Sequence, residues 1–255
     1  MINVIKIGGN VIDNPEALEA FLKDFAAISG DKILVHGGGK EATRMSESMG
    51  IKANMIEGRR VTDRQTLDIV TMVYAGLINK RIVASLQRLG CDAVGLTGAD
   101  GNFIQATRRS PKPIDYGFVG DIDRINHKFL ETLFKNRNVP VVCAICHDGD
   151  GTLLNCNADS VASAVACGAA ALAPTRLTFC FEKPGVMTDV NDESSVIPLV
   201  TAETFAELKE SGAIAGGMIP KIHNALLSAS EGVEEVRICS AEKLLSGSGT
   251  YIRTK

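Results

Sequence analysis

Two short stretches in the first forty residues place lysine and glycine where apolar runs end. The stretch VIKIGGN carries Lys6 inside an apolar run that stops at Gly8 and Gly9, and VHGGGK contains Gly37 and Gly38 within three consecutive glycines. A buried lysine is costly without a partner, and glycines at a strand end let a ligand approach the backbone. Free N–H groups at a helix start attract phosphate or carboxylate. We therefore expect an anionic ligand here.

Residues of similar chemistry occur again in the second half of the chain. Asn155, Asn157 and Asp159 stand in LLNCNADS at the start of an alanine-rich segment, and GGMIPK carries Gly217 and Lys221 at the start of another helical segment. Helix capping and a favourable interaction with the helix dipole would explain one asparagine and the aspartate, and most helical lysines are solvated. These ordinary roles leave Asn155 unexplained.

Taken together, these residue types suit phosphoryl transfer. That reaction is catalysed mainly by positioning and by neutralising charge on the transferred group and the leaving oxygen. Lys6 and Lys221 would supply positive charge, the glycines would supply backbone N–H groups, and Asp159 would hold both lysines. The chain contains neither the Walker sequence nor G-x-G-x-x-G, and HGGG without G-x-S-x-G disfavours a serine hydrolase.

One cysteine motif points elsewhere. CAICH, from Cys143 to His147, matches the C-x-x-C-H sequence of haem attachment and half of a zinc site. The surrounding VPVVCAIC is typical of a buried strand in which cysteine serves as a small apolar residue, and no second C-x-x-C or H-x-x-H accompanies it. We favour the buried strand and assign no metal ligand.

The elements that must position these residues follow from hydrophobic periodicity. Strand-like apolar runs alternate with amphipathic helical segments, which predicts an α/β fold with a mainly parallel central sheet covered by helices. We expect strands at 2–7, 32–36, 93–97, 139–146, 177–182 and 235–239. We expect helices at 14–28, 39–49, 63–89, 127–135, 158–171, 202–211 and 217–231.

Between residues 100 and 126, glycine-rich turns separate short alternating segments, which predicts inserted β-hairpins that could form a lid or pocket wall. No long Pro/Ser linker divides the chain. We expect two lobes on one continuous sheet, 1–173 and 174–255.

Composition excludes several classes of protein. The 255 residues are 45% hydrophobic and 22% charged, as in ordinary globular domains, and the net charge of −3 offers no footprint for nucleic acid or an anionic membrane. The chain enters a strand at once, and no apolar run reaches the roughly 18 residues of a membrane helix. Seven scattered cysteines suit reduced thiols. We expect a cytoplasmic protein that binds neither nucleic acid nor membrane.

Across nearly its whole length the sequence resembles the amino acid kinase family, and within it the N-acetylglutamate kinases of arginine biosynthesis. The motifs that carry the resemblance are KIGGN, VHGGGKEA, GRRVTD, GFVGDI, NVPVV, LNCNAD, GGMIPK and the closing GTYI. The family fold is a three-layer αβα sandwich around a mainly parallel sheet, with acyl-amino-acid and dimer contacts in an N-terminal lobe and ATP in a C-terminal lobe. This agrees with the predicted alternation of strands and helices.

The resemblance also implies roles for individual residues. Lys6 and Lys221 would stabilise the phosphates and the phosphoryl group in transfer, with Asp159 orienting both. Phosphate would be bound by Gly8, Gly9 and Gly217, and the acylglutamate by Gly37, Gly38, Arg60, Asn155 and Asn157. A planar guanidinium such as that of Arg60 suits a carboxylate. Magnesium would arrive with ATP, held largely by phosphates and water.

The reaction implied is transfer of the ATP γ-phosphate to the side-chain carboxylate of an N-acylglutamate. N-acylation keeps the amine from cyclising onto the activated carbonyl. Kinases of the same fold that act on carbamate, aspartate, glutamate or a nucleotide remain alternatives, as does a non-catalytic sensor of amino acid or nucleotide. Arg60 with Asn155 and Asn157 favours an acylated amino acid, and an intact set of Lys6, Asp159 and Lys221 argues against a sensor.

The sequence departs from the family pattern at two places. FEKPGV stands where the family commonly has a Thr-Asp-Val segment, so Glu182 and Lys183 could alter nucleotide contacts. Arg59 precedes Arg60 where the family usually has an apolar residue near the substrate, which suggests an N-succinyl rather than an N-acetyl group; a solvent-facing Arg59 is equally open. Because the chain begins at the first strand, without the N-terminal helix of arginine-inhibited hexamers, we expect a homodimer with little arginine feedback.

Overall fold

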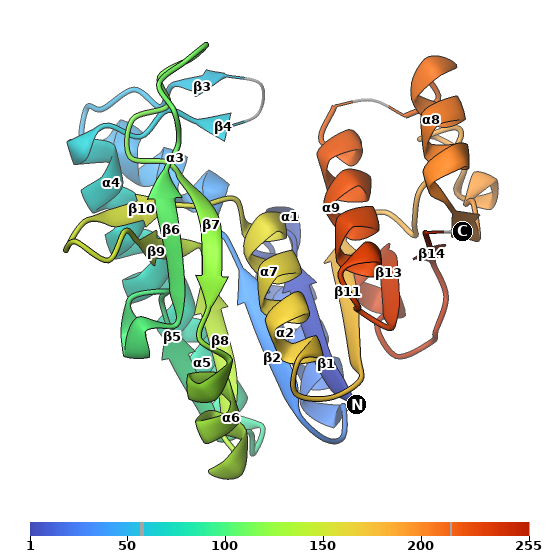
Figure 1. The fold of residues 1–255 in the computed structure, drawn as a ribbon, viewed down its shortest axis with the longest axis horizontal. Helices are drawn as coiled ribbons and strands as arrows, with labels where there is room; N and C mark the ends of the chain where they lie inside the picture. Colours follow the sequence, from blue (N-terminus) through green and yellow to red (C-terminus); the bar gives the residue numbers. More distant parts are fainter. Residues whose placement is uncertain (57–58, 215, 255) are drawn as a thin grey trace.

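A mostly parallel sheet runs through the whole molecule in a computed structural model that describes residues 1–56, 59–214 and 216–254 (Figure 1). Its eight strands lie in the order β12-β14-β13-β11-β1-β2-β8-β5. Neighbouring strands are parallel except β13 and β14, which are antiparallel. The strands are β1 (Ile2–Ile7), β2 (Lys32–His36), β5 (Ala93–Leu96), β8 (Val139–Cys143), β11 (Thr175–Phe181), β12 (Leu199–Val200), β13 (Glu235–Ser240) and β14 (Thr250–Ile252).

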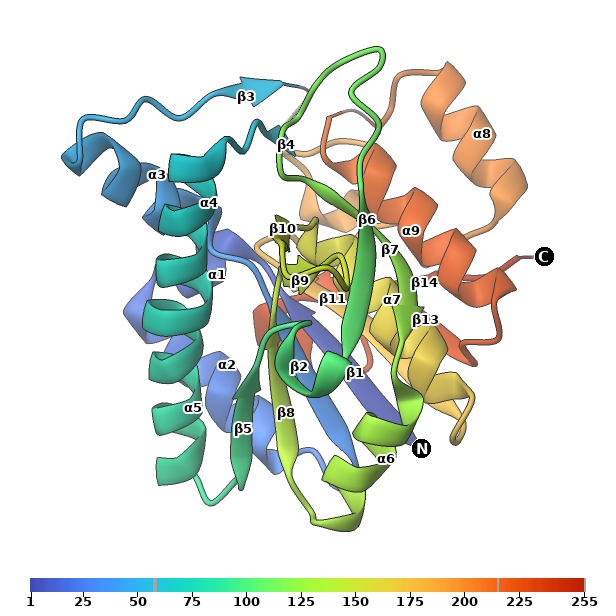
Figure 2. The same cartoon turned by 60° about the vertical axis from the view of Figure 1, so that its left-hand side comes forward.

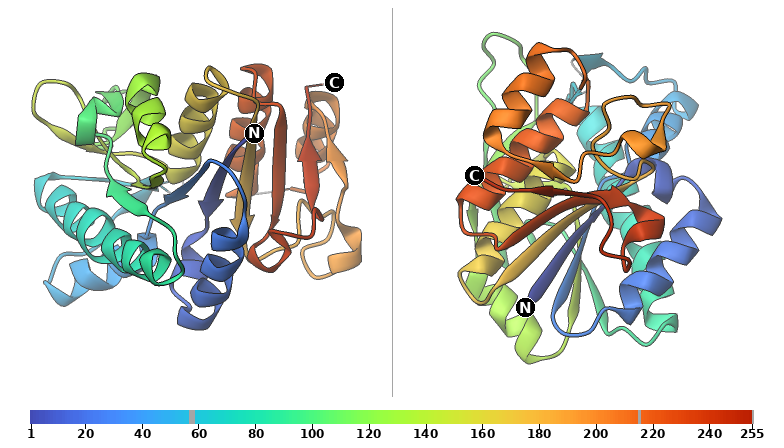
Figure 3. Two further views of the ribbon diagram at one scale, coloured as in Figure 1. Left: turned by 90° about the horizontal axis from the view of Figure 1, so that it is seen from below. Right: turned by 90° about the vertical axis from the view of Figure 1, so that its right-hand side faces the viewer.

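Helices cover both faces of this sheet, as the edge-on view of Figure 3 shows. One face carries α6 (His127–Lys135), α7 (Ala158–Ala170) and α9 (Met218–Ser230), with α8 (Ala202–Glu210) packed against α9. The other face carries α1 (Gly9–Ile12), α2 (Pro15–Ala27), α3 (Gly39–Ser48), α4 (Arg64–Thr71) and α5 (Asn79–Arg88). The predicted three-layer α/β class is therefore confirmed.

A second, four-stranded sheet lies beside the first, in the order β10-β9-β6-β7. It contains β6 (Ile104–Arg108) and β7 (Gly120–Ile125), the antiparallel hairpin predicted between residues 100 and 126. The run predicted as one strand at 139–146 divides, because the chain leaves the main sheet after β8 and enters the second sheet as β9 (Ile145–His147), which pairs with β10 (Leu153–Asn155).

The predicted helix at 63–89 is a continuous helical segment with a π-helical stretch, η1 (Met72–Ile78), between α4 and α5. Segments that lack a periodic pattern were not predicted: the short hairpin β3 (Met55–Ile56) and β4 (Arg59–Arg60), together with α1, β10, β12 and β14. Three short 3-10 turns complete the described chain at Asp100–Asn102, Glu193–Ser195 and Ala241–Lys243.

The helical segment Arg64–Arg88 is, by length and composition, apolar enough to cross a membrane, although 44% of its most apolar stretch is buried within the protein. The sequence analysis did not single out this segment, because Asp68, Lys80 and Arg81 interrupt its apolar residues. Its buried side chains include Leu67, Val70 and Ile82, and they belong to the hydrophobic core, which is typical of a core helix of a globular fold.

The cysteines of the C-x-x-C-H motif lie on buried strands. Cys143 ends β8 and Cys146 lies in β9, both without solvent exposure. Burial raises the pKa of the Cys143 thiol to about 12, so it stays protonated and packs as an apolar side chain. This placement agrees with the buried-strand interpretation of the motif.

Candidate active site

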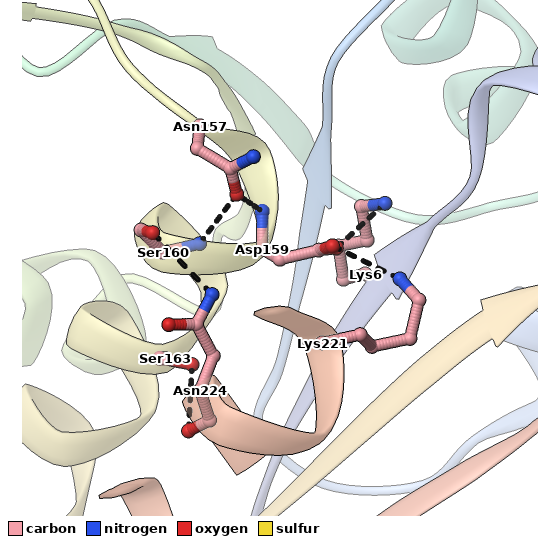
Figure 4. Close-up of polar contacts among 7 residues, drawn as sticks. All are labelled: Lys6, Asn157, Asp159, Ser160, Ser163, Lys221 and Asn224. Atoms are coloured by element: carbon pink, nitrogen blue, oxygen red, sulfur yellow. Dashed lines mark hydrogen bonds and ion pairs between the residues drawn. The ribbon is translucent and has the colours of Figure 1, made fainter. Parts of the chain in front are cut away.

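Three charged residues from distant parts of the chain meet where β1, α7 and α9 come together (Figure 4). The Lys6 Nζ lies 2.7 Å from Asp159 Oδ1, and the Lys221 Nζ lies 2.9 Å from Asp159 Oδ2. Each lysine side chain is only 11% exposed and the aspartate 15%. One carboxylate therefore holds two ammonium groups that both border open space, as the sequence predicted.

Electrostatics keep this cluster ionised. Burial opposes ionisation of Asp159, but attraction to the two ammonium groups outweighs it and holds the pKa of this carboxyl well below its usual range. The pKa of Lys221 is lowered, first by burial and then by repulsion from Lys6, with Asp159 opposing both. The cluster carries one net positive charge, which suits it to an anionic ligand.

Local structure explains why these side chains converge. Lys6 lies on a central strand, between Val35 of β2 and Phe179 of β11. Asp159 lies in the first turn of α7, whose start is capped by Asn157: its Oδ1 accepts hydrogen bonds from the N–H groups of Asp159 and Ser160 at 2.9 and 3.1 Å. The capping role considered for Asn157 is thus confirmed.

Lys221 lies in the first turn of α9, where Pro220 is tolerated because its missing N–H has no intrahelical partner. Asn224, one turn further, braces α9 against α7: its Nδ2 donates to Ser160 Oγ at 3.4 Å, and its backbone oxygen accepts from Ser163 Oγ at 3.4 Å (Figure 4). The Lys221 ammonium also lies 5.5 Å from the ring centres of both Phe179 and Phe181.

All the site residues predicted from the sequence line two adjoining cavities. A cleft of about 880 Å³ is bordered by Gly8, Gly9, Asp159, Gly217 and Lys221. A smaller pocket of about 230 Å³ is bordered by Gly37, Gly38, Asn155 and Asn157. Lys6 and Arg60 border both. A reactant in each cavity would meet its partner beside Lys6.

The two glycines after β1 differ in what they offer. The Gly8 N–H donates to Cys180 O at 2.8 Å, and an added Cβ would lie 3.2 Å from Phe181 Cβ. Gly8 therefore lets the end of β1 lie close to Phe181 of β11. Its N–H already has a hydrogen-bond partner in Cys180 O. Nothing lies within 4 Å of a Cβ added at Gly9 or Gly217, so both leave their backbone open to the cleft.

Arg60 is fixed in the wall of the smaller pocket with unused hydrogen-bonding capacity. Its Nη2 donates to Gly39 O at 2.8 Å and to Thr43 Oγ1 at 2.7 Å, both in the first turns of α3. Its Nη1 is buried without a partner in the described chain. A buried guanidinium nitrogen without an acceptor is costly, and a ligand carboxylate in the pocket would satisfy it.

The two asparagines border the same pocket as Arg60. Asn155 is buried, with its Nδ2 donating to Thr62 Oγ1 at 3.0 Å and its N–H to Phe118 O at 2.9 Å. Asn157 uses its oxygen as the cap of α7, which turns its Nδ2 away from the helix. Asn155 thus has a structural partner in Thr62, which the sequence did not indicate.

A buried polar network behind the glycine turn was missed by the sequence analysis. His36 is fully buried; its Nδ1 donates to Gly37 O at 2.8 Å, and its Nε2 accepts from Asn79 Nδ2 at 3.0 Å. Burial lowers the pKa of His36 to about 4, so the ring is neutral at physiological pH. Asn79 also donates to Val141 O at 2.9 Å, tying the turn to β8.

The π-helical stretch η1 completes this support. Its Tyr74 and Ile78 pack on Gly38, where an added Cβ would overlap Ile78. The altered helical register also directs Asn79, the next residue, toward His36. Only the histidine of VHGGGK gave a signal for this network; Asn79 stands 43 residues away along the chain.

The substituted FEKPGV segment lies partly in the cleft. Glu182 borders it and accepts a hydrogen bond from Asn10 Nδ2 at 2.8 Å, whereas the Lys183 Nζ donates to Val190 O at 3.1 Å. An acidic side chain therefore lies at the edge of the larger cleft. Gly58 of GRRVTD and Ala215, before GGMIPK, lie outside the described residues.

Comparison with known proteins relates the whole chain to one family. The model of the amino acid kinase family matches residues 1–240. An acetylglutamate kinase of Cytophaga hutchinsonii is 53% identical over 95% of this chain and 92% of its own, and one of Phocaeicola vulgatus is 48% identical over 99% and 98%.

Among solved structures, smu.665 of Streptococcus mutans UA159 superposes with a TM-score of 0.84 at 29% identity, covering 100% of this chain and 99% of its own. Both the match to the family model and the full-length similarity to curated relatives lead to one assignment. The chain belongs to the amino acid kinase family.

Proposed function

We propose that this protein is an acetylglutamate kinase, which transfers the γ-phosphate of ATP to the side-chain carboxylate of N-acetyl-L-glutamate in arginine biosynthesis. The observation that carries the proposal is the Lys6–Asp159–Lys221 cluster at the junction of two cavities. The larger cavity would hold the nucleotide and the smaller one the acceptor. The names of the relatives favour the same activity.

In the acceptor pocket, Arg60 would bind the α-carboxylate through its unpartnered Nη1. Asn155 and Asn157 would donate from the other wall, and the N–H groups of the Gly37–Gly38 turn would bind ligand oxygens at the start of α3. These contacts would direct the side-chain carboxylate toward Lys6. Because that carboxylate is ionised at neutral pH, it needs no general base to become a nucleophile.

In the transfer step, a carboxylate oxygen forms a bond to the γ-phosphorus while the bond to the bridging oxygen breaks, and that oxygen keeps the electron pair as ADP leaves. Lys6 and Lys221 would neutralise the charge that spreads over the transferred group and the leaving oxygen. Asp159 would position both ammonium groups without touching the reacting atoms. The product is an acyl phosphate.

ATP would bind along the cleft between the two glycine segments, with Gly9 and Gly217 open to the phosphates. The charged residues of the lining are cationic apart from Asp13, Glu182 and Asp159, whose charge the two lysines offset. This fits magnesium that arrives with ATP, held largely by phosphate oxygens and water. Magnesium would neutralise further phosphate charge, and Glu182 and Lys183 would distinguish the nucleotide contacts here from the usual family pattern.

We further infer a cytoplasmic homodimer with an N-terminal lobe, 1–173, for the acylglutamate and a C-terminal lobe, 174–255, for ATP. Residues 1–173 supply β1, β2, β5 and β8, and the second part supplies β11 to β14 of the same sheet. The edge strand β5 offers a surface for pairing. Light scattering after gel filtration tests the dimer; a monomer or a hexamer would contradict it.

The activity is tested by incubating the protein with MgATP and a panel of acceptors and trapping the acyl phosphate with hydroxylamine as a hydroxamate. N-acetyl-L-glutamate should give product, whereas L-glutamate, L-aspartate and carbamate should give little. Preference for one of the latter would support another kinase of the fold. Binding without turnover of any acceptor would support a sensor and refute the proposal.

A further inference from the structure

We propose that this enzyme prefers an N-acylglutamate whose acyl chain ends in a second carboxylate, as in N-succinyl-L-glutamate, and that Arg59 binds that carboxylate. The inference rests on the proposed function and extends it to the acyl group. It follows from the position of Arg59, the charge around it and the shape of the acceptor pocket.

Arg59 lies in the wall of the acceptor pocket. It is half-buried in β4, next to Arg60, and borders the same 230 Å³ pocket. The loop between β6 and β7 lies beside this strand (Figure 2). Thr62, just after β4, forms two backbone hydrogen bonds with that loop. Its N–H donates to Tyr116 O at 2.9 Å, and its backbone carbonyl oxygen accepts from the Phe118 N–H at 2.7 Å.

That loop brings a second arginine to the pocket. Arg109 follows β6, donates its N–H to Val119 O at 2.8 Å, and borders the pocket together with Val119. Arg59 and Arg109 therefore come from two segments that backbone hydrogen bonds hold side by side. With Arg60, three arginine residues border one small pocket.

The three guanidinium groups differ in what already satisfies them. Arg109 forms a bidentate ion pair with Asp121, so its charge is compensated. Arg60 is fixed by Gly39 O and Thr43 and, on the proposed function, receives the α-carboxylate. Within residues 1–56, 59–214 and 216–254, no acidic side chain forms an ion pair with Arg59.

The carboxylates of the substrate can be assigned to the cations of the site one by one. N-acetylglutamate carries two carboxylates, of which one faces Lys6 as the phosphoryl acceptor and the other faces Arg60. Neither of these carboxylates nor an acidic side chain of the described residues would then pair with Arg59, which is half-buried in the pocket wall. A carboxylate at the end of that group would pair with Arg59, and a planar guanidinium suits it.

The remaining walls suit a short methylene chain between the amide and that carboxylate. Val119, Ala144 and Ala158 border the pocket with small apolar side chains. A succinyl group has two methylenes at this position, which such walls can contact without polar groups being left unpaired. The pocket therefore combines an apolar path with a cationic end.

The test compares three acceptors under identical conditions: N-acetyl-, N-butanoyl- and N-succinyl-L-glutamate. The butanoyl compound matches the length of the succinyl group but ends in methyl instead of carboxylate, so it separates length from charge. We expect kcat/KM for N-succinyl-L-glutamate to exceed that for N-butanoyl-L-glutamate by about 10- to 100-fold, the range of a charge-assisted hydrogen bond.

Three variants assign the preference to Arg59. Arg59→Leu should bring the succinyl-to-butanoyl ratio close to one, and Arg59→Lys should restore part of it. Arg81→Leu removes the same charge from the exposed side of α5 and should leave the ratio as in the unmodified enzyme. Because the ratio compares two substrates on one preparation, partial unfolding of a variant does not affect it.

Every result of this test either supports or overturns the inference. Three results would overturn the inference while acylglutamate phosphorylation stands. These are equal kcat/KM for the succinyl and butanoyl compounds, a higher kcat/KM for N-acetyl-L-glutamate than for the succinyl compound, and a preference for the succinyl compound that survives Arg59→Leu. Phosphorylation of none of the three acceptors would overturn the proposed function and the inference with it.

Discussion

Replacing Asp159 with asparagine tests whether one carboxylate organises both lysines. The substitution keeps the shape of the side chain but leaves two largely buried ammonium groups facing each other without an anion. At an effective dielectric constant of about 20, an ion pair near 4 Å is worth on the order of 4 kcal/mol. Desolvation offsets much of this, and breaking a buried pair by removing one partner costs about 3–5 kcal/mol.

We therefore expect Asp159→Asn to lower the free energy of unfolding by about 3–5 kcal/mol at pH 7 in urea titrations. The pKa of Asp159 is lowered by folding, so its contribution is present above the ordinary value of 3.8 and is lost as the pH falls below it. The stability difference from the unmodified protein should shrink in acid. Exposed Asp68→Asn, on α4, is the matched control.

The pH dependence of kcat/KM gives a second, independent test of the Asp159→Asn substitution. Lys221 must be charged to act, and its pKa is already lowered by burial and by Lys6, so kcat/KM should fall on the alkaline side earlier than for an exposed lysine. Removing the carboxylate lowers the pKa of Lys221 further, and this alkaline limb should move to lower pH.

A double-mutant cycle refutes or supports the reasoning even if Asp159→Asn folds poorly. Lys6→Met in the Asp159→Asn background removes the repulsion between the ammonium groups, so the double variant should be more stable than Asp159→Asn alone. An Asp159→Asn protein with unmodified stability and alkaline limb, or a double variant without recovery, would show that Asp159 does not hold the lysines electrostatically.

Three further predictions follow from the site. Lys6→Ala and Lys221→Ala should each lower kcat by about 10²–10³-fold with an unchanged circular dichroism spectrum, whereas exposed Lys135→Ala should not; full activity in both would refute the mechanism. Gly38→Ala, whose Cβ would overlap Ile78, should raise KM for the acceptor, while Gly76→Ala, with open space around the added Cβ, should not; equal KM values would exclude the steric role. Because His36 has a pKa of about 4 when folded against 6.5 when unfolded, the unfolded chain binds more protons between these values, and stability should fall by about 3 kcal/mol from pH 7 to pH 4. Urea titrations of His36→Gln should lack this component.

Periodic segments allowed much of the fold to be predicted. Strand β1 and helix α6 were predicted at the bounds that the structure gives. β1 is a short apolar run that the sheet buries almost completely, and α6 has a helical apolar pattern whose Leu130 and Leu133 are buried. The hairpin β3–β4 was missed because each strand has two residues and no pattern can form in that length. The split of the predicted strand at 139–146 was missed because a buried apolar run does not show where the chain changes sheets.

The residue types of the site were also predictable, since charged and glycine residues at strand ends are unusual. Their partners were not. The pairing of Asn79 with His36, or of Asn155 with Thr62, depends on contacts between segments 43 and 93 residues apart. The same holds for Arg59 and Arg109, which share a pocket because Thr62 joins two loops. The catalytic and binding roles of the site residues stay predictions until variants are measured.

The position of β1 in the middle of the sheet has a consequence for biosynthesis. Among the strands of this sheet, β1 is synthesised before the others and can pair with β2 within a few dozen residues, but its other neighbour, β11, begins at Thr175. Until then one edge of β1 stays unpaired, with the apolar side chains of a central strand. Unpaired apolar edges promote aggregation, so a nascent chain stalled before residue 175 should need a chaperone, whereas the completed chain should not.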